Sequence, residues 1–275
     1  AGPAPAPAWK KYFGPLIFVG VLLLKFGSKL KFIIAPAAKF LPTVLKTGST
    51  MILSIGAYSM LWGWKYAAGF VLLILVHELG HVLAAKKHGV AASAPMFIPF
   101  LGAFIALKEA PKTAVVEAEI GIGGPEWGTF GAIVCHACGL AFDIPLLVAL
   151  AWSGYMLNLF NLIPVGQLDG GHIAQAISPW LWVPGFGIAL WLALTTSSFL
   201  LWLIVLLGIP RVISLFRPKT TGHDAFHSVP VSARWMMTLR YFGLIAFLAL
   251  AMDVSHRGLD QVRERSKAEH QAGVK

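Results

Sequence analysis

Residues 66–85 have the sequence YAAGFVLLILVHELGHVLAA, and this stretch decides the class of fold. Its twenty residues include no Asp, Lys or Arg and a single Glu, so a helix formed by them can cross the roughly 30 Å of hydrocarbon in a bilayer. The whole chain has the same character, since 57% of its 275 residues are hydrophobic and 12% are charged. The sequence therefore predicts a membrane protein.

Further apolar runs predict an all-α polytopic membrane protein with about six transmembrane helices. They cover residues 49–64, 125–154, 155–164, 180–216 as two short spans, and 235–254. Residues 95–124 differ, because proline and glycine recur among them and the β-compatible runs at 96–107 are too broken for a long helix. We expect a short membrane-associated β-hairpin or re-entrant element there, followed by a helix that opens at Pro125.

These spans and the segments between them predict three parts. Residues 1–48 are expected to form an N-terminal tail and an interfacial or irregular membrane segment. Residues 49–216 form the transmembrane core that carries the candidate catalytic site, and residues 217–275 form a connecting loop, the last transmembrane helix and a solvated tail. Arg240 lies near the start of that last helix, where its side chain is expected to reach the interface.

The net charge of +10 does not indicate a nucleic-acid-binding surface, because the basic residues lie between apolar runs and not among stacking aromatic residues of a soluble face. Basic residues that flank spans instead indicate cytoplasmic loops. They include Lys86, Lys87, Arg211, Arg217, Lys219 and Arg234.

The only two cysteines, Cys135 and Cys138, imply no disulfide framework. They are three residues apart in an apolar run, so they share one face of a helix, with His136 between them in sequence. A redox or metal pair is one interpretation. We expect the simpler one, in which they are small side chains packed on that face.

The span at residues 66–85 carries His77-Glu78-Leu79-Gly80-His81, an HExxH motif. Residues four apart share one face of a helix, so both imidazoles can reach one zinc ion at about 2.0–2.1 Å. Glu78 is adjacent, close enough to hydrogen-bond a water on that ion and to take its proton during attack on a carbonyl. The motif therefore predicts two metal ligands and a general base.

An HExxH motif alone is a moderate signal of a metal site. The alternative interpretation is that its polar side chains only satisfy one another inside a helix bundle. Its position strengthens the prediction. A central Asp, Lys or Arg in a span costs roughly 2.5–3.5 kcal/mol on insertion scales, so ionisable residues there normally mark a functional interior. We therefore expect an active site inside the bilayer.

A catalytic zinc also needs a third protein ligand and an open position for water. Asp169 is the candidate, within NLIPVGQLDGGH at residues 161–172, where one proline and three glycines disfavour a continuous helix. Irregular backbone at membrane depth is buried in protein or lines a wet cavity. An N-cap role is the alternative for Asp169, and Asp143 is the strongest rival ligand. His172 is expected to support the site more readily than to bind metal.

Together these residues resemble the site-2 protease family of intramembrane zinc metalloproteases. The resemblance covers residues 49–176 in order and rests on the HExxH helix, followed by Asn161-x-x-Pro164 and Leu168-Asp169-Gly170. It implies one zinc ion held by His77, His81 and Asp169. It also implies that Glu78 is the base and that Asn161 assists substrate binding or stabilises the oxyanion.

The same resemblance implies an endopeptidase that cleaves peptide bonds in or near transmembrane segments of membrane proteins. Many family members carry a PDZ domain in the core or a C-terminal pair of CBS domains. This chain has room for neither, so we expect a minimal core enzyme. Because a helical substrate must unwind before cleavage, residues 96–107 are expected to offer a strand edge for β-augmentation, with a re-entrant packing loop as the alternative.

Two other classes of protein are alternatives. A CAAX-processing metalloprotease also uses HExxH, but the Leu168-Asp169-Gly170 element favours the site-2 type. A non-catalytic zinc-binding membrane protein needs ligands but no base, so the presence of Glu78 argues against it.

The expected partners are a transmembrane substrate and the lipid bilayer, with no nucleic acid, and the sequence leaves the oligomeric state open. We expect a multi-pass protein of a prokaryotic plasma membrane. Because Lys86 and Lys87 follow His81 closely, the site should lie nearer the cytoplasmic side.

Overall fold

The computed structural model of the chain describes residues 42–216, 226 and 228–273. The chain divides into two compact units, Ala1–Ser49 and Thr50–Lys275. In the first unit the described residues, 42–49, are helical. Most of the predicted N-terminal segment at 1–48, and residues 217–225 of the predicted connecting loop, therefore lie outside the described residues.

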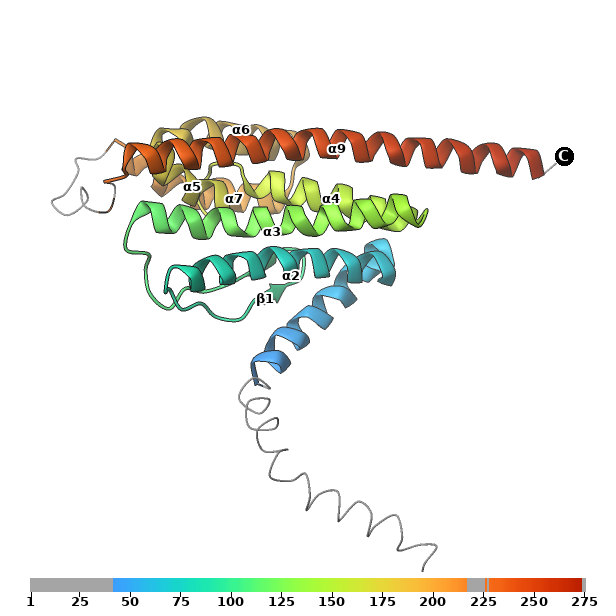
Figure 1. Cartoon of the computed structure of the whole chain (residues 1–275), viewed down its shortest axis with the longest axis horizontal. Coiled ribbons are helices and arrows are strands. Elements are labelled where there is room, and N and C mark those ends of the chain that lie inside the picture. Colours follow the sequence, from blue (N-terminus) through green and yellow to red (C-terminus); the bar gives the residue numbers. More distant parts are fainter. Residues whose placement is uncertain (1–41, 217–225, 227, 274–275) are drawn as a thin grey trace, which may run out of the picture. The chain divides into compact units, whose positions relative to one another are not determined.

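Helices make up most of the second unit (Figure 1). A first helix ends at residue 62. The elements after it are α2 (Trp64–Lys87), β1 (Met96–Ile98), β2 (Gly102–Phe104), α3 (Ala114–Ala141), α4 (Pro145–Asn161), α5 (Asp169–Ile177), η1 (Pro179–Leu181), α6 (Trp182–Thr196), α7 (Phe199–Ser214) and α9 (Val231–Gly273).

Helix α3 lies at the centre of the bundle. It packs against α2, α4 and α5, while α9 packs along α4 and α6 pairs with α7. Buried apolar side chains from α3, α4, α5 and α9 form one core cluster, which includes Ile122, Tyr155, Ile173, Tyr241 and Leu248. Because α2 and α5 contact the same central helix, segments far apart in the sequence can meet beside it.

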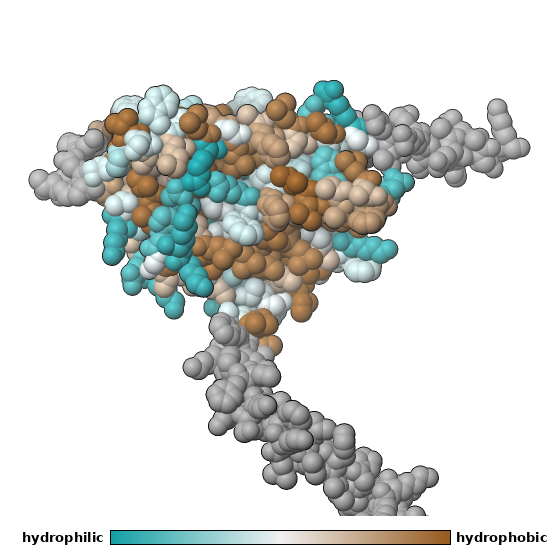
Figure 2. Space-filling view, in the orientation of Figure 1, coloured by the Kyte–Doolittle hydropathy of each residue, from teal (hydrophilic) through white to brown (hydrophobic). Residues whose placement is uncertain are grey.

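Three helical segments among the described residues are long and apolar enough to cross a membrane: Trp64–Lys87, Pro179–Thr196 and Val231–Leu259. Helix α7 is apolar but shorter. Figure 2 shows hydrophobic residues across the middle of the visible surface and hydrophilic residues gathered toward the end where α2 stops and α3 begins. The helical membrane protein predicted from the sequence is confirmed, whereas this criterion finds three spans and the sequence predicts about six.

The hairpin predicted within residues 95–124 is also found. Strands β1 and β2 are antiparallel, and Phe97 pairs with Ala103 at the centre of the register. A tight turn joins them, with the Leu101 amide donating to the Ile98 carbonyl at 3.1 Å. Phe100 in that turn has a φ of 66°, a left-handed conformation that bulky residues rarely adopt.

The start of α3 corrects one prediction. The sequence predicts a helix that opens at Pro125, but α3 begins at Ala114 and contains Pro125. Thr113 caps this helix, since its side-chain oxygen accepts from the Val116 amide at 3.2 Å. The glycines before Pro125 therefore lie inside a helix and not in a broken segment.

Packing against α2 explains why those glycines are helical. A Cβ atom on Gly80 of α2 would come within 2.3 Å of the Gly123 carbonyl oxygen, and one on Gly123 would come within 2.7 Å of the Ala84 Cβ. Two helices that approach this closely need small residues at the contact. The packing contact outweighs the weak helix propensity of glycine, about 1 kcal/mol per residue.

Helix α4 corrects a second prediction. The predicted runs 125–154 and 155–164 divide between Gly154 and Tyr155, but α4 is continuous from Pro145 to Asn161. The chain turns before Pro145 instead, where Asp143 has a positive φ of 53°. Pro145 is at the first position of α4, where a missing amide proton costs no helical hydrogen bond.

Arg240 makes contacts with α3 that the sequence does not predict. Its Nη1 donates to Glu119 at 2.6 Å, and its Nε and Nη2 donate to Glu126 at 2.9–3.0 Å. The two carboxylates accept four hydrogen bonds from the guanidinium, and hydrogen bonds between charged groups are stronger than those between neutral groups. This cluster joins α9 to the central helix.

Candidate active site

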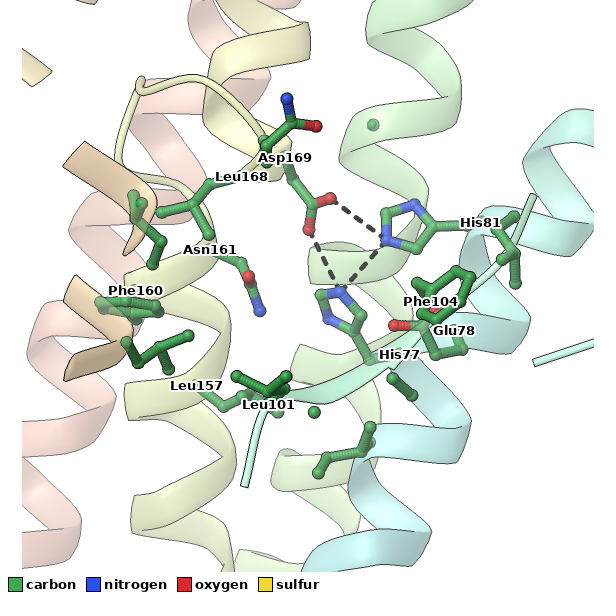
Figure 3. A pocket seen from close by; sticks show the side chains of 18 of the residues that line it. His77, Glu78, His81, Leu101, Phe104, Leu157, Phe160, Asn161, Leu168 and Asp169 are labelled. Atoms are coloured by element: carbon green, nitrogen blue, oxygen red, sulfur yellow. Dashed lines mark hydrogen bonds and ion pairs between the residues drawn. The ribbon is translucent and has the colours of Figure 1, made fainter. Parts of the chain in front are cut away.

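The two histidines of the HExxH motif and Asp169 converge on one point (Figure 3). His77 and His81 lie one turn apart on α2, are buried, and place their Nε2 atoms 3.1 Å apart. One carboxylate oxygen of Asp169 lies 3.1 Å from His77 Nε2 and the other lies 3.3 Å from His81 Nε2. Asp169 is the first residue of α5 and Leu168 is its N-cap, so the side chain of Asp169 points to the histidines and does not cap the helix.

Hydrogen bonds fix which ring nitrogen of each histidine faces this point. His81 Nδ1 lies 2.8 Å from the Ile120 carbonyl oxygen, which can only accept, so this nitrogen carries the proton. His77 Nδ1 lies 2.8 Å from Asn158 Oδ1, while the Asn158 amide nitrogen donates to the Gly154 carbonyl at 2.7 Å. In the neutral imidazoles both Nε2 atoms are therefore unprotonated and face Asp169.

This donor set fits a divalent cation. Two lone pairs and a carboxylate repel one another unless a positive charge lies between them, and within the described structure one buried Asp169 oxygen has no hydrogen-bond donor. Ligands at 2.0–2.1 Å around a tetrahedral zinc lie about 3.3 Å apart. The three measured separations, 3.1–3.3 Å, are close to that value. Each histidine also has the outward Nδ1–H bond that metal-binding histidines normally make.

Gly124 of α3 leaves the space for this cluster. A Cβ atom at Gly124 would lie 2.2 Å from His81 Nε2 and 2.8 Å from His77 Nε2. Gly124, in a glycine run where the sequence predicts a broken segment, thus forms the surface against which both imidazoles pack.

Glu78 belongs to the same buried group. The candidate ligand atoms of His77, Glu78 and His81 all lie within 4.8 Å of one another. The Asp169 carboxylate oxygens lie closer still to the two Nε2 atoms, at 3.1 and 3.3 Å. The arrangement therefore offers one carboxylate that contacts both imidazoles and a second carboxylate beside them.

A cavity of about 920 Å³ opens on this cluster. Apolar side chains from the first helix, α2, the hairpin, α4 and α7 make up most of its lining. The polar lining residues are few, namely the four already described together with Glu117, Asn161, Gln167 and His172. Such a cavity admits a largely apolar chain and presents it to a small polar centre.

The other candidate residues lie in different places. Asn161 ends α4 and lines the cavity, as Figure 3 shows, whereas Asp143 is exposed in the turn between α3 and α4 and is not part of the cluster. His172 lines the cavity, with its Nδ1 2.6 Å from Glu117 Oε1. Cys135 and Cys138 are free thiols on α3.

Sequence reasoning does not identify Asn158, which orients His77. Asn158 is almost completely buried and lies one turn before Asn161 on α4. An amide side chain within the apolar run of 145–161 is the signal that points to it, because polar residues inside spans usually have a partner.

Two imidazoles, a bridging carboxylate and an adjacent carboxylate within a membrane helix bundle define a metal-dependent hydrolase of the membrane. Residues 65–144 and 140–203, which together cover half of the chain, match the profile of peptidase family M50. The chain belongs to this family, which is the site-2 protease family that the sequence resembles.

Curated relatives agree with this assignment. Zinc metalloprotease MJ0392 of Methanocaldococcus jannaschii is 38% identical over 130 residues, which cover 46% of this chain and 37% of the relative. The Rip3 protein of Mycobacterium tuberculosis is 30% identical over 142 residues, 47% of this chain and 35% of the relative. The chloroplast protein EGY1 of Arabidopsis thaliana is 26% identical over 229 residues, which cover 63% of this chain and 41% of the relative. All three names describe a zinc metalloprotease, and the matches span less than half of each relative.

Proposed function

We propose that the chain is a zinc-dependent intramembrane endopeptidase, which hydrolyses peptide bonds in or near transmembrane segments of membrane proteins. One observation carries the proposal: the convergence of His77 Nε2, His81 Nε2 and the Asp169 carboxylate at the wall of a large apolar cavity. Membership of peptidase family M50 supports the same chemistry.

Zinc is the proposed cofactor, with His77, His81 and Asp169 as its three protein ligands. When bound, zinc supplies a Lewis acid that activates water and polarises the peptide carbonyl. Asn158 and the Ile120 carbonyl keep both imidazoles in the tautomer that directs Nε2 to the ion.

Glu78 is the proposed general base. It takes a proton from the attacking water as the water oxygen bonds to the carbonyl carbon, and it then delivers that proton to the amine as the C–N bond breaks. Asn161 lines the cavity near Asp169, where its amide N–H can donate to the carbonyl oxygen as negative charge develops.

Strand β2 is the proposed docking edge for an unwound substrate. Residues 100–105 all line the cavity, and β1 pairs with one edge of β2, which leaves the other edge for an extended segment. Proline substitutions along residues 97–106 test this idea. Cleavage should fall at alternating positions if main-chain hydrogen bonds hold the substrate, and uniform tolerance would contradict the docking edge.

We also propose about six transmembrane spans in a prokaryotic plasma membrane, with the active site toward the cytoplasm. Lys86 and Lys87 are exposed at the end of α2 and follow His81 by little more than one turn, which supports that side. Accessibility of single cysteines placed near Lys112 and near Asp143 should differ between the two faces of sealed vesicles. Labelling of both from one face would contradict this topology.

The first experiment measures bound zinc by elemental analysis in detergent-purified protein, because this requires no known substrate. Wild type should hold about one zinc per chain, and His77→Ala and Asp169→Ala should hold much less. Asp143→Ala is the matched control and should retain zinc, since Asp143 lies outside the cluster. Glu78→Gln should abolish cleavage of any substrate. Normal zinc in Asp169→Ala would remove the third ligand, and no zinc in folded wild type would contradict the proposed function.

A further inference from the structure

We call the proposed zinc ligands His77, His81 and Asp169 the metal cluster. Aromatic rings line another part of the same cavity. Tyr58 and Trp62 belong to the first helix, Phe70 to α2 and Phe100 to the hairpin turn, and all four line the cavity. Their neighbouring ring centroids are 5.4–5.7 Å apart, with one stacked pair and three edge-to-face pairs. We call these four residues the aromatic wall.

The aromatic wall is held in place by contacts from three separate segments. Tyr58 is at its centre, only 6% exposed, and touches each of the other three rings. Phe100 contacts it from a backbone with φ of 66°, a left-handed conformation that bulky residues rarely adopt. Aromatic side chains have few rotatable bonds and lose little entropy when a ligand packs against them, so these four rings can select the shape of an apolar side chain.

The spacing along α2 relates the aromatic wall to the metal cluster. Phe70, His77 and His81 line the same cavity and recur at helical spacing, so they lie on one face of the helix. Seven residues separate Phe70 from His77, which is about 10 Å along a helix axis at 1.5 Å per residue. An extended chain covers that distance in about three residues.

Strand β2 connects the same two places. It follows directly from the turn that holds Phe100 against Tyr58, and its last residue, Phe104, lines the same cavity as Glu78. A segment that pairs with β2 while its scissile bond faces Glu78 therefore passes the aromatic wall. None of the four rings carries a formal charge, so this part of the cavity favours an apolar side chain and disfavours a charged one.

We propose that the aromatic wall is a specificity subsite, which selects a large apolar side chain about three residues from the scissile bond of the substrate. This inference rests on the proposed function and names the feature of the substrate that the site recognises. The side of the scissile bond on which the selected residue lies depends on whether the substrate pairs parallel or antiparallel to β2.

Cleavage of synthetic transmembrane peptides tests the subsite. The peptides are built of leucine and alanine with one Asn-Pro pair to weaken the helix, and mass spectrometry of the products locates the bond that wild type cuts. Phe, Leu, Ala or Asp is then placed at each position on both sides of that bond. We expect kcat/KM to favour Phe over Ala by about tenfold at the third position on one side, with Asp poorest. Equal rates for all four residues there would overturn the proposal.

Enzyme variants then assign the preference to the wall. Phe70→Ala and Trp62→Ala should bring the Phe-to-Ala ratio of kcat/KM close to one, while zinc content shows that the site is intact. Phe130→Ala is the matched control, because Phe130 is a 57% exposed aromatic residue on α3 outside the cavity lining, and it should keep the wild-type ratio. A ratio that survives in Phe70→Ala and Trp62→Ala would also overturn the proposal.

Photocrosslinking separates failure of the subsite from failure of the proposed function. The Glu78→Gln protein is mixed with a peptide that carries benzoylphenylalanine at the third position, and crosslinked residues are located by mass spectrometry. Crosslinks to Tyr58, Trp62, Phe70 or Phe100 support the subsite even if wild type cleaves no peptide. Crosslinks confined to lipid or to the outer surface of α3 would overturn it even if wild type cleaves normally.

Discussion

The proposed metal site of His77, His81 and Asp169 is built from two regions that are held in different ways. Helix α2 presents His77 and His81 from one continuous element, so any intact helix brings the two rings together. Asp169 follows an irregular connection between α4 and α5, and backbone carbonyls on both sides of Asp169 accept hydrogen bonds from other helices. Tyr241 of α9 donates to the Leu162 carbonyl at 2.5 Å, and Trp182 of α6 donates to the Gly171 carbonyl at 2.8 Å. One half of the site thus depends on local periodicity and the other on distant contacts.

Gly124→Ala should have the largest effect, because Gly124 packs against both histidines of α2. The change leaves all three proposed ligands in place. The added methyl group would overlap His81 Nε2, so either the imidazole or α3 must move. We expect zinc content to fall at least about tenfold in elemental analysis. Gly187→Ala is the control, since nothing lies within 4 Å of a Cβ at that position of α6. Full zinc occupancy in Gly124→Ala would show that the tight approach is not needed.

Asn158→Ala should weaken zinc binding about 10- to 100-fold, because His77 loses the acceptor that fixes its tautomer. Competition with a chelator of known affinity measures this change. Asn161→Ala is the matched comparison on the same helix and should keep wild-type zinc affinity, since Asn161 lines the cavity and not the His77 ring. Equal zinc affinities in the two variants would contradict the assigned role of Asn158.

Tyr241→Phe tests the Asp169 side of the site, which depends on contacts with distant helices. It leaves the buried Leu162 carbonyl without this donor, at a cost of about 1–3 kcal/mol, and should lower both the thermal midpoint and peptide cleavage. Tyr66→Phe is the control, since it removes the hydroxyl contact with Ser153 on the α2 side. If both variants lose stability but keep the same cleavage rate per bound zinc, the connection before Asp169 does not depend on α9.

Arg240→Gln should have the smallest effect. Its ion pairs with Glu119 and Glu126 are partly exposed, so about 1 kcal/mol or less is expected after screening. For a protein of this size that corresponds to about 2–4 °C in the thermal midpoint, with zinc content unchanged. Loss of zinc in this variant would show that α9 also positions α3 at the metal cluster.

Much of the candidate site could be predicted because its signals are local. The HExxH spacing places two rings on one face of any helix, and a carboxylate after a proline and glycine run is available to bind a metal. The hairpin was predictable for the same reason, since its proline and glycine residues leave only short extended runs. The positions that could not be predicted are those whose structural role depends on a contact with another helix. They include Asn158, Arg240 and the glycines before Pro125.

The sequence by itself determined that the protein is a helical membrane protein, that one helix carries the two histidines, and that Glu78 lies next to them on that helix. Those features follow from hydrophobicity and helical periodicity, which act within a single segment. The tertiary structure decided that residues 121–124 continue a helix, that Asn158 orients His77, and that aromatic rings close one part of the cavity. Each of these depends on contacts between segments that are distant in sequence. A glycine disfavours a helix in an isolated chain, but it allows two helices to pack closely once α2 lies against α3.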